Sequence, residues 1–227
     1  MRLLGVLASS ALILTACAGT IDETGRGASS EVEASDAPVT VELIDSGFGQ
    51  QDGYVQGIAL VTTDDDRAVG EFVTVSMNFL DASGGIVGTS DQVESFSWVG
   101  QDLVMPIWLD LSDTPGVEVV EVDASVTLSG HGPRGDLLEP LERVEASEMR
   151  ADQYGGTTAV FELTNPSSSN LEGARVGVVC YGADGAITGG ASEYPNLIAA
   201  EKSVLLESTV VTSVAPTKCV AYPNYGV

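Results

Sequence analysis

The amino-acid sequence predicts an all-β protein built of two antiparallel β-sandwiches in tandem. Three observations lead to this prediction: a composition that favours strands, a repeat at an offset of 101 residues, and apolar residues that alternate along each copy. The chain has 227 residues, of which 44% are hydrophobic. Valine, threonine and glycine are frequent, which favours strands and turns over helices. A chain of this length suits one or two domains.

The repeat appears when the chain is aligned with itself. "VSMNFLDASGGIVG" (75–88) matches "VGVVCYGADGAITG" (176–189), and "FSWVGQDLVM" (96–105) matches "LIAAEKSVLL" (197–206) in its apolar pattern. Upstream, "GIALVTT" pairs with "VFELTNP" after a small change in length. A repeat of about 100 residues is too long for a solenoid unit and suits a whole sandwich domain.

The repeat also predicts where the domains begin and end. We expect the first sandwich to span 38–130 and the second to span 141–227, with a linker over 131–140 between them. Helix formers gather only in 137–150, where Pro140 interrupts them. We interpret this segment as a linker that leads into the first strand of the second copy, and a short helix is the alternative.

The strands of each copy follow from a period of two in the apolar residues. The positions expected to face the cores of the two copies are Val73, Val75, Met77, Phe79, Ala174, Val176, Val178 and Cys180. "DASGG" and "GADG" follow these strands directly, and their Asp, Ser and Gly residues are turn formers. We therefore expect two hairpins whose second strands start at Ile86 and Ile187. Trp98 and Trp108 are expected to fill the core of the first copy.

The N-terminus has the pattern of a targeting segment. Arg2 is followed by an apolar run over 3–16, which is shorter than the roughly 20 residues that span a bilayer but suits a secretory signal. The run ends in "LTAC" (14–17), which resembles the lipobox of bacterial lipoproteins. There the Cys thiol is alkylated by a diacylglycerol and the chain is cut just before it. The resemblance implies a lipoprotein signal peptide over 1–16 and a lipidated Cys17; an ordinary signal peptide is the alternative.

The segment 17–37 is predicted to be a flexible acidic tether, because it contains almost no large apolar residue. With an acylated Cys17 before it, the folded part would be held at the outer face of the plasma membrane or in the cell envelope, with membrane lipid as its first partner. More than one acyl chain is needed for stable anchoring.

The charge of the chain excludes one class of partner. The formal net charge is −24 at pH 7, with 33 acidic and 9 basic residues. Nucleic-acid binding draws its affinity from clustered basic side chains, so we expect no nucleic-acid partner. The same acidic surface keeps the protein soluble.

The second copy carries motifs of a known family. "FELTNPSSSNLEGARVGVVCYGADGAITG" resembles the FxLYD-type domains of bacterial surface lipoproteins. The matching residues are Asn165 and Pro166 in the loop, Tyr181 in the strand, and Asp184 and Gly185 in the turn, whereas Gly182 replaces the usual Asp. In the first copy, Phe79, Leu80 and Asp81 form "FLD", which matches the motif less well. The resemblance implies immunoglobulin-like β-sandwiches and no known reaction.

The two cysteines that remain after Cys17 form an even pair. An exported protein meets an oxidising compartment, where such a pair favours a disulfide between Cys180 and Cys219. In the first copy Phe79 stands at the position of Cys180, so apolar packing would replace the bridge there. Two buried free thiols are the alternative.

No catalytic or cofactor motif is present, so we expect a non-enzymatic protein without a cofactor. The single histidine, His131, lies in a glycine-rich stretch and is interpreted as a solvated residue. The weak candidates for a metal site are Asp64, Asp65 and Asp66, whose mutual repulsion Ca²⁺ could relieve. The aromatic residues that could form a binding patch if exposed are Trp98, Trp108, Tyr181, Tyr194, Tyr222 and Tyr225.

These observations predict a membrane-anchored bacterial surface lipoprotein whose tandem immunoglobulin-like domains act as a non-catalytic interaction or structural module. Its partner would be a protein or the cell wall. The alternative is a solute-binding or accessory lipoprotein of an envelope transport or assembly system, which would need a concave pocket between the two copies.

Overall fold

The computed structural model describes residues 38–129, 138–151 and 156–225. The predicted signal peptide, Cys17, the tether, His131 and most of the predicted linker lie outside the described residues. Residues 38–227 form one compact unit by their contacts. Among the described residues, no helix is of a length and hydropathy that could cross a membrane.

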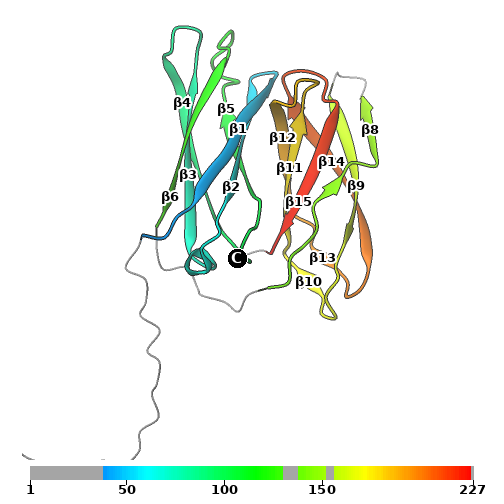
Figure 1. The fold of residues 1–227 in the computed structure, drawn as a ribbon. Helices are drawn as coiled ribbons and strands as arrows, with labels where there is room; N and C mark the ends of the chain where they lie inside the picture. Colours follow the sequence, from blue (N-terminus) through cyan, green and yellow to red (C-terminus); the bar gives the residue numbers. More distant parts are fainter. Residues whose placement is uncertain (1–37, 130–137, 152–155, 226–227) are drawn as a thin grey trace, which may run out of the picture. The chain divides into compact units, whose positions relative to one another are not determined.

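The first copy folds into two three-stranded antiparallel sheets (Figure 1). One sheet has the order β1-β2-β5, with bounds Glu42–Gln51, Tyr54–Thr62 and Leu103–Asp110. The other has the order β4-β3-β6, with bounds Ile86–Ser95, Phe72–Leu80 and Glu121–Leu128. A single turn of 3₁₀ helix, Asp66–Ala68, joins β2 to β3. Two sheets of this kind form a β-sandwich.

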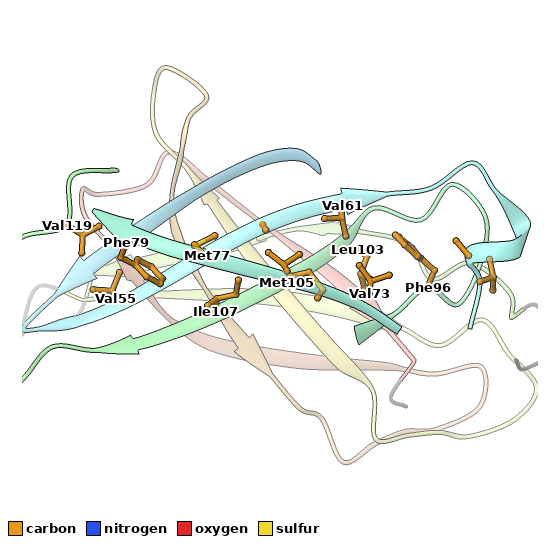
Figure 2. Packing of buried hydrophobic residues seen from close by; sticks show 14 of the residues in the cluster. Val55, Val61, Val73, Met77, Phe79, Phe96, Leu103, Met105, Ile107 and Val119 are labelled. Carbon is orange, nitrogen blue, oxygen red and sulfur yellow. The ribbon is translucent and has the colours of Figure 1, made fainter. Parts of the chain in front are cut away.

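The core of the first sandwich lies between these two sheets. Val73, Val75, Met77 and Phe79 are fully buried in it, which confirms the face predicted for this strand. Figure 2 shows how side chains from β3 meet those from β2 and β5, including Met105 and Ile107. Phe96, which follows β4, closes one end of the cluster (Figure 2). Because β3 alternates buried and half-buried residues along its whole length, its period of two was a reliable guide.

The second copy repeats this topology. Its sheet order β8-β9-β14 corresponds to β1-β2-β5, and its order β12-β11-β15 corresponds to β4-β3-β6. The bounds are Glu148–Ala151, Thr157–Thr164, Ser203–Thr212, Ile187–Glu193, Arg175–Tyr181 and Lys218–Asn224. The short strand β7 (Val144–Glu145) extends the second group, and β10 (Leu171–Glu172) pairs with β13 (Leu197–Ile198). The prediction of an all-β protein with two immunoglobulin-like antiparallel sandwiches is therefore confirmed.

Strand β14 joins the two groups of the second copy into one seven-stranded sheet. It pairs with β9 along most of its length and with β12 at Gly189 and Gly190. The second core lies between the two groups and contains Val176, Val178 and Cys180 of β11. These residues occupy the face that the alternation predicted.

The register of the strands confirms that the two copies are equivalent. The hairpin turns lie where they were predicted, since β4 starts at Ile86 and β12 starts at Ile187. In the first copy Phe79 of β3 stands opposite Val122 of β6. In the second copy Cys180 of β11 stands opposite Cys219 of β15. The same pair of positions is thus filled by apolar side chains in one copy and by cysteines in the other.

A third apolar cluster joins the two sandwiches. It contains Ile58 and Leu60 from β2, Val104 from β5, and residues from the outer faces of β11, β12 and β15: Val179, Ile187, Val220 and Tyr222. The outer face of sheet β1-β2-β5 therefore packs against the outer face of the strands β15, β11 and β12. Strands β2 and β11 are buried on both faces as a result.

Glycines allow the backbones to approach closely at this contact. A Cβ atom on Gly177 of β11 would lie 2.6 Å from Cβ of Val104, and one on Gly47 of β1 would lie 2.7 Å from Cβ of Ile187. Both distances are far below an ordinary van der Waals contact, so a side chain at either position would push the sandwiches apart. Gly177 corresponds to Ser76 in the first copy, which is half-buried and faces away from the core.

Two sequence-based interpretations differ from the structure. Trp108 lies on the outer face of β5 and is 48% exposed, so it does not fill the first core. Trp98 is partly buried but packs against the core of the second copy, next to Tyr225. Trp98 lies where the two copies meet, and the size of its ring does not distinguish that contact from a core. The described part of 137–150 contains β7 and part of β8 and no helix.

Candidate functional site

The structure contains the disulfide between Cys180 and Cys219. The two residues are direct cross-strand partners on β11 and β15, with Cα atoms 4.1 Å apart. Both are fully buried in the second core. The bridge therefore ties two neighbouring strands together inside the sandwich, and solvent does not reach its sulfur atoms. Such a position is typical of a structural disulfide and not of a redox-active one.

Asn165 organises the loop after β9. Its side chain is buried, and its amide nitrogen lies within hydrogen-bond distance of the carbonyl oxygens of Ser169, Ile198 and Ala199, at 2.9, 3.0 and 3.3 Å. Its side-chain oxygen accepts a bond from the backbone N–H of Ser167. Pro166, which follows, is exposed. Asn165 thus supports loop structure, because its polar atoms are used up by the backbone around it.

The motif residues in the two hairpin turns are also structural. Asp81 accepts bonds from the backbone N–H groups of Ser83 and Gly85 and from the Ser83 hydroxyl. These bonds hold the pKa of its carboxyl below the ordinary value, with the Ser83 side chain as the largest cause. Asp184 accepts from the N–H of Ala186, and Gly185 adopts a φ of 83°, which glycine tolerates best. Leu80 lies next to Asp81 at the end of β3.

The aspartates considered for a metal ion are arranged for another purpose. Asp65 caps the 3₁₀ turn by accepting the N–H of Arg67, and its carboxylate also forms an ion pair with the Arg67 guanidinium at 2.5 Å. This guanidinium lowers the pKa of Asp65. Within the part of the chain that the structure describes, no group of three metal-ligating side chains converges. Neither Asp64 nor Asp66 joins Asp65 in a common site there.

A concave pocket of about 550 Å³ lies on the outer face of β11, β15 and β7. Its lining residues are Arg143, Glu145, Tyr181, Gly182, Ala183, Gly185, Thr217, Lys218, Val220 and Tyr222. All of them come from the second copy. The pocket adjoins the cluster between the sandwiches, since Val220 and Tyr222 belong to both. We call it the tyrosine pocket.

Two phenols lie at the base of the tyrosine pocket. The hydroxyl oxygens of Tyr181 and Tyr222 are 3.3 Å apart, at hydrogen-bond distance. The backbone carbonyl of Tyr181 accepts bonds from the N–H and the hydroxyl of Thr217, which fixes the strand end beside the pocket. Burial raises the pKa of Tyr181 well above the ordinary phenol value, and the hydrogen bond with Tyr222 adds to the effect. Tyr181 is therefore neutral at physiological pH.

Two cations line the same pocket, each next to a carboxylate. Lys218 Nζ lies 3.1 Å from Oε2 of Glu145, and Arg143 Nη1 lies 3.0 Å from Oδ2 of Asp102. The side chains of Arg143, Lys218 and Glu145 are about half exposed or more, and that of Asp102 is about one-third exposed. Because these side chains are exposed, a ligand can reach them. Ion pairs of this kind contribute little to stability.

A smaller pocket of about 140 Å³ lies beside the first and shares Arg143 and Tyr222 with it. The remaining lining residues come from both copies: Trp98, Gly100 and Asp102 from the first, and Leu141 and Pro223 from the second. This is the point at which residues of the two copies meet around a concavity.

A polar network holds the same end of the contact between the copies. Asn224 of β15 accepts hydrogen bonds from Ser97 and Gln101 of the first copy, both at 2.9 Å. Glu94 of β4 forms an ion pair of 2.6 Å with Arg175 of β11, and the Glu94 side chain is only 6% exposed. Its second carboxylate oxygen has no hydrogen-bond partner within the described residues. These contacts fix the two copies relative to each other.

The aromatic residues considered for a binding patch fall into separate groups. Tyr181 and Tyr222 meet in the tyrosine pocket, and Trp98 meets Tyr225 edge to face at a ring distance of 6.1 Å. Trp108 stacks on Tyr54 at 5.3 Å, and both rings are substantially exposed. Tyr194, at 60% exposure, stands in the loop after β12. No single patch unites all of them in the described structure.

Two comparisons with known proteins give no match for this chain. The chain matches none of the protein-family models against which it was scanned, and a search of curated proteins finds no match to it. Function must therefore be argued from the residues and their geometry.

The tyrosine pocket was not predicted as a site, although its residues carried a signal. Two outward positions of 175–181 hold Gly177 and Val179, where the first copy has Ser76 and Asn78. Polar residues on the outer face of one copy and apolar ones on the other indicate that only the second face is covered. Sequence reasoning singled out Tyr181 and Tyr222 but could not bring them together, because their strands lie 41 positions apart in the chain.

Proposed function

We propose that this protein is a lipid-anchored surface lipoprotein whose two fused immunoglobulin-like sandwiches act as a non-catalytic interaction or structural module. The single structural observation that supports this proposal is the contact between the copies. An apolar cluster, an ion pair and a network around Asn224 hold two sandwiches together as one compact unit. Such a unit presents one composite surface to a partner.

The N-terminal sequence supplies the proposed anchor. The apolar run and "LTAC" (14–17) point to lipidation of Cys17, and the acidic tether would hold the sandwiches away from the bilayer. The net charge of −24 disfavours close contact with anionic lipid. We infer that the partner is a protein or the cell wall, and that the motif residues Asn165, Asp81 and Asp184 build the fold.

Metabolic labelling with an alkyne-tagged fatty acid tests the anchor. We expect the wild-type chain to incorporate the label and to fractionate with membranes, and the variant Cys17→Ala to do neither. The double variant Cys180→Ala with Cys219→Ala is the matched control, since it removes two cysteines but should keep the label. Equal labelling of wild type and Cys17→Ala would contradict the proposal.

Crosslinking on intact cells tests the interaction. The anchored protein should capture a reproducible protein or cell-wall partner, and the capture should depend on an intact contact between the copies. Failure to crosslink any partner, with correct anchoring, would argue for a passive surface role.

The second candidate is a solute-binding or accessory lipoprotein of an envelope transport or assembly system. The tyrosine pocket favours it, because its volume lies within the range of small-ligand sites. However, side chains fill the contact between the sandwiches, and all residues that line the larger pocket come from one copy. A ligand enclosed between two domains is therefore not the arrangement that this geometry supports, and we favour the interaction module.

A further inference from the structure

The tyrosine pocket has the size and the lining of a site for a small polar molecule. Its volume of about 550 Å³ falls within the range of small-ligand sites. Tyr181, Val220 and Tyr222 form an apolar base, and Val220 and Tyr222 are nearly fully buried. The polar side chains of the lining lie at or next to β7 and at the start of β15, and the turn after β11 adds two glycines and Ala183. The apolar base can pack against the C–H groups of a ligand, and the polar side chains around it can form hydrogen bonds with the ligand's polar groups.

The two phenols at the base have unused hydrogen-bonding capacity. Each hydroxyl can donate one bond and accept two, yet the pair shares a single contact of 3.3 Å. One O–H group therefore has no acceptor among the described residues. A phenol hydroxyl both donates and accepts, so the pair offers a donor and an acceptor at once. A ligand hydroxyl has the same dual character.

The charges around the pocket balance each other. Arg143 and Lys218 supply two positive charges, and Asp102 and Glu145 supply two negative charges at ion-pair distance. The surrounding chain has a net charge of −24, which repels anions over long range. Asp102 lines the smaller pocket beside it, and both cations of the tyrosine pocket are thus paired with a carboxylate. Paired cations inside a strongly acidic molecule disfavour an anionic ligand. Its guanidinium, ammonium and carboxylate groups still offer many directed donors and acceptors.

We propose that the tyrosine pocket binds a neutral saccharide, with the sugar ring against Tyr181 and Val220 and its hydroxyls on the phenol pair, Lys218 and Glu145. A sugar combines a C–H face with hydroxyls that both donate and accept, which matches the apolar base and the mixed rim. This inference deepens the proposed function and rests on it, because it makes the partner of the interaction module a glycan of the cell surface.

The test is calorimetric titration of the purified full-length protein in a mild non-ionic detergent without sugar groups. The neutral probes are chitotetraose, cellotetraose, maltotetraose and mannotetraose; the anionic probes are tetragalacturonate and inorganic phosphate. We expect saturable binding of at least one neutral probe and weaker or no binding of the anionic ones. Tyr181→Phe removes one hydroxyl and Lys218→Gln removes one charge, and each should weaken binding about fivefold or more, as expected for one lost hydrogen bond.

Two matched variants control for general effects of the substitutions. Tyr194→Phe changes an exposed tyrosine in another loop, and Lys202→Gln changes an exposed lysine elsewhere in the second copy. Both should bind the neutral probe as the wild type does. Circular dichroism of each variant shows whether the fold is kept.

Three results would overturn the saccharide proposal: no binding of any neutral probe, tighter binding of an anionic probe, or unchanged binding by Tyr181→Phe and Lys218→Gln. None of these depends on the anchor or on cells. If Cys17 is lipidated and a partner is captured while no sugar binds, the interaction module stands and the saccharide site fails. If a sugar binds but Cys17→Ala still labels and fractionates like wild type, the anchoring proposal fails instead.

Discussion

At the scale of single residues, most of the motif side chains are fully engaged in building the fold. Asp81 and Asp184 close hairpin turns, and Asn165 satisfies the backbone of a long loop. Tyr181 is the exception, because it packs against the cluster between the copies and also lines the tyrosine pocket. A buried polar group that bonds several backbone atoms is costly to remove, since its partners remain buried and unpaired.

Asn165 therefore makes a strong test of the loop after β9. We expect Asn165→Ala to lower the free energy of unfolding by about 2–3 kcal/mol, because backbone groups around the buried amide lose their partners. Urea denaturation followed by circular dichroism measures the change. The control is Asn196→Ala, an exposed position, which should change stability by less than about 0.5 kcal/mol. Similar values for the two variants would show that the Asn165 bonds do not hold the loop.

Tyr181 predicts how stability responds to alkaline pH. Its pKa is raised in the folded protein, chiefly by burial, so the unfolded chain releases this proton at a lower pH than the native one does. The stabilising contribution is complete below the ordinary phenol pKa near 10 and is lost as the pH rises above it. We expect Tm to fall more steeply above pH 10 for wild type than for Tyr181→Phe. Parallel curves from pH 8 to pH 11.5 would contradict this.

At the scale of elements, β11 differs most from its counterpart β3. Both strands place one face in the core of their own sandwich. The other face of β3 is half-buried and polar, whereas that of β11 is covered by β2 and β5 of the first copy. A strand that is buried on both faces reads as a continuous apolar run and not as an alternation.

Gly177 on that second face tests whether close approach is required. We expect Gly177→Val to cost about 1–3 kcal/mol, because the added side chain overlaps Val104 and overpacks the contact. The control Ser76→Val makes the same side chain at the equivalent position of β3, where the outer face is only half-buried. It should be neutral or slightly stabilising, because valine favours strands. Denaturant titrations of both variants measure the change in the free energy of unfolding. Equal changes for Gly177→Val and Ser76→Val would exclude a packing role for Gly177.

At the scale of the whole molecule, the contact between the copies combines an apolar cluster with a partly buried ion pair. Glu94 is almost fully buried, and one of its oxygens has no hydrogen-bond partner in the described chain, so the protein depends on Arg175 to compensate its charge. Removing one partner of such a pair leaves an uncompensated charge, whereas removing both can be nearly neutral.

A double-mutant cycle measures this dependence. We expect Arg175→Met to cost about 2–3 kcal/mol, less than for a fully buried pair because the arginine is one-third exposed. Adding Glu94→Gln should restore most of the loss. Arg150→Met, at an exposed pair with Glu148 and Glu207, should cost less than about 1 kcal/mol. If Arg175→Met behaves like Arg150→Met, the pair does not hold the copies together.

The sequence predicted local features better than the contact between the copies. The core face of β3 follows from the alternation of apolar residues, and the two hairpin turns follow from their turn-forming residues. The disulfide partners follow from the number of cysteines. Each of these signals involves few residues or neighbouring ones. The turn at Asp52 and Gly53 was overlooked, although Asp-Gly is a strong hairpin signal and both residues have positive φ. The position of Trp98 could not be predicted, because it depends on how the two sandwiches pack.

The covered outer face of β11 also limits how the two copies can evolve. With Gly177 and Val179 where the first copy has Ser76 and Asn78, the second sandwich could not exist alone without exposing an apolar strip. Loss of the first copy would then be penalised by aggregation, and each further apolar substitution at the contact raises that penalty. A duplication that began with two separable domains becomes irreversible in this way, and natural selection thereafter acts on the pair as one heritable unit.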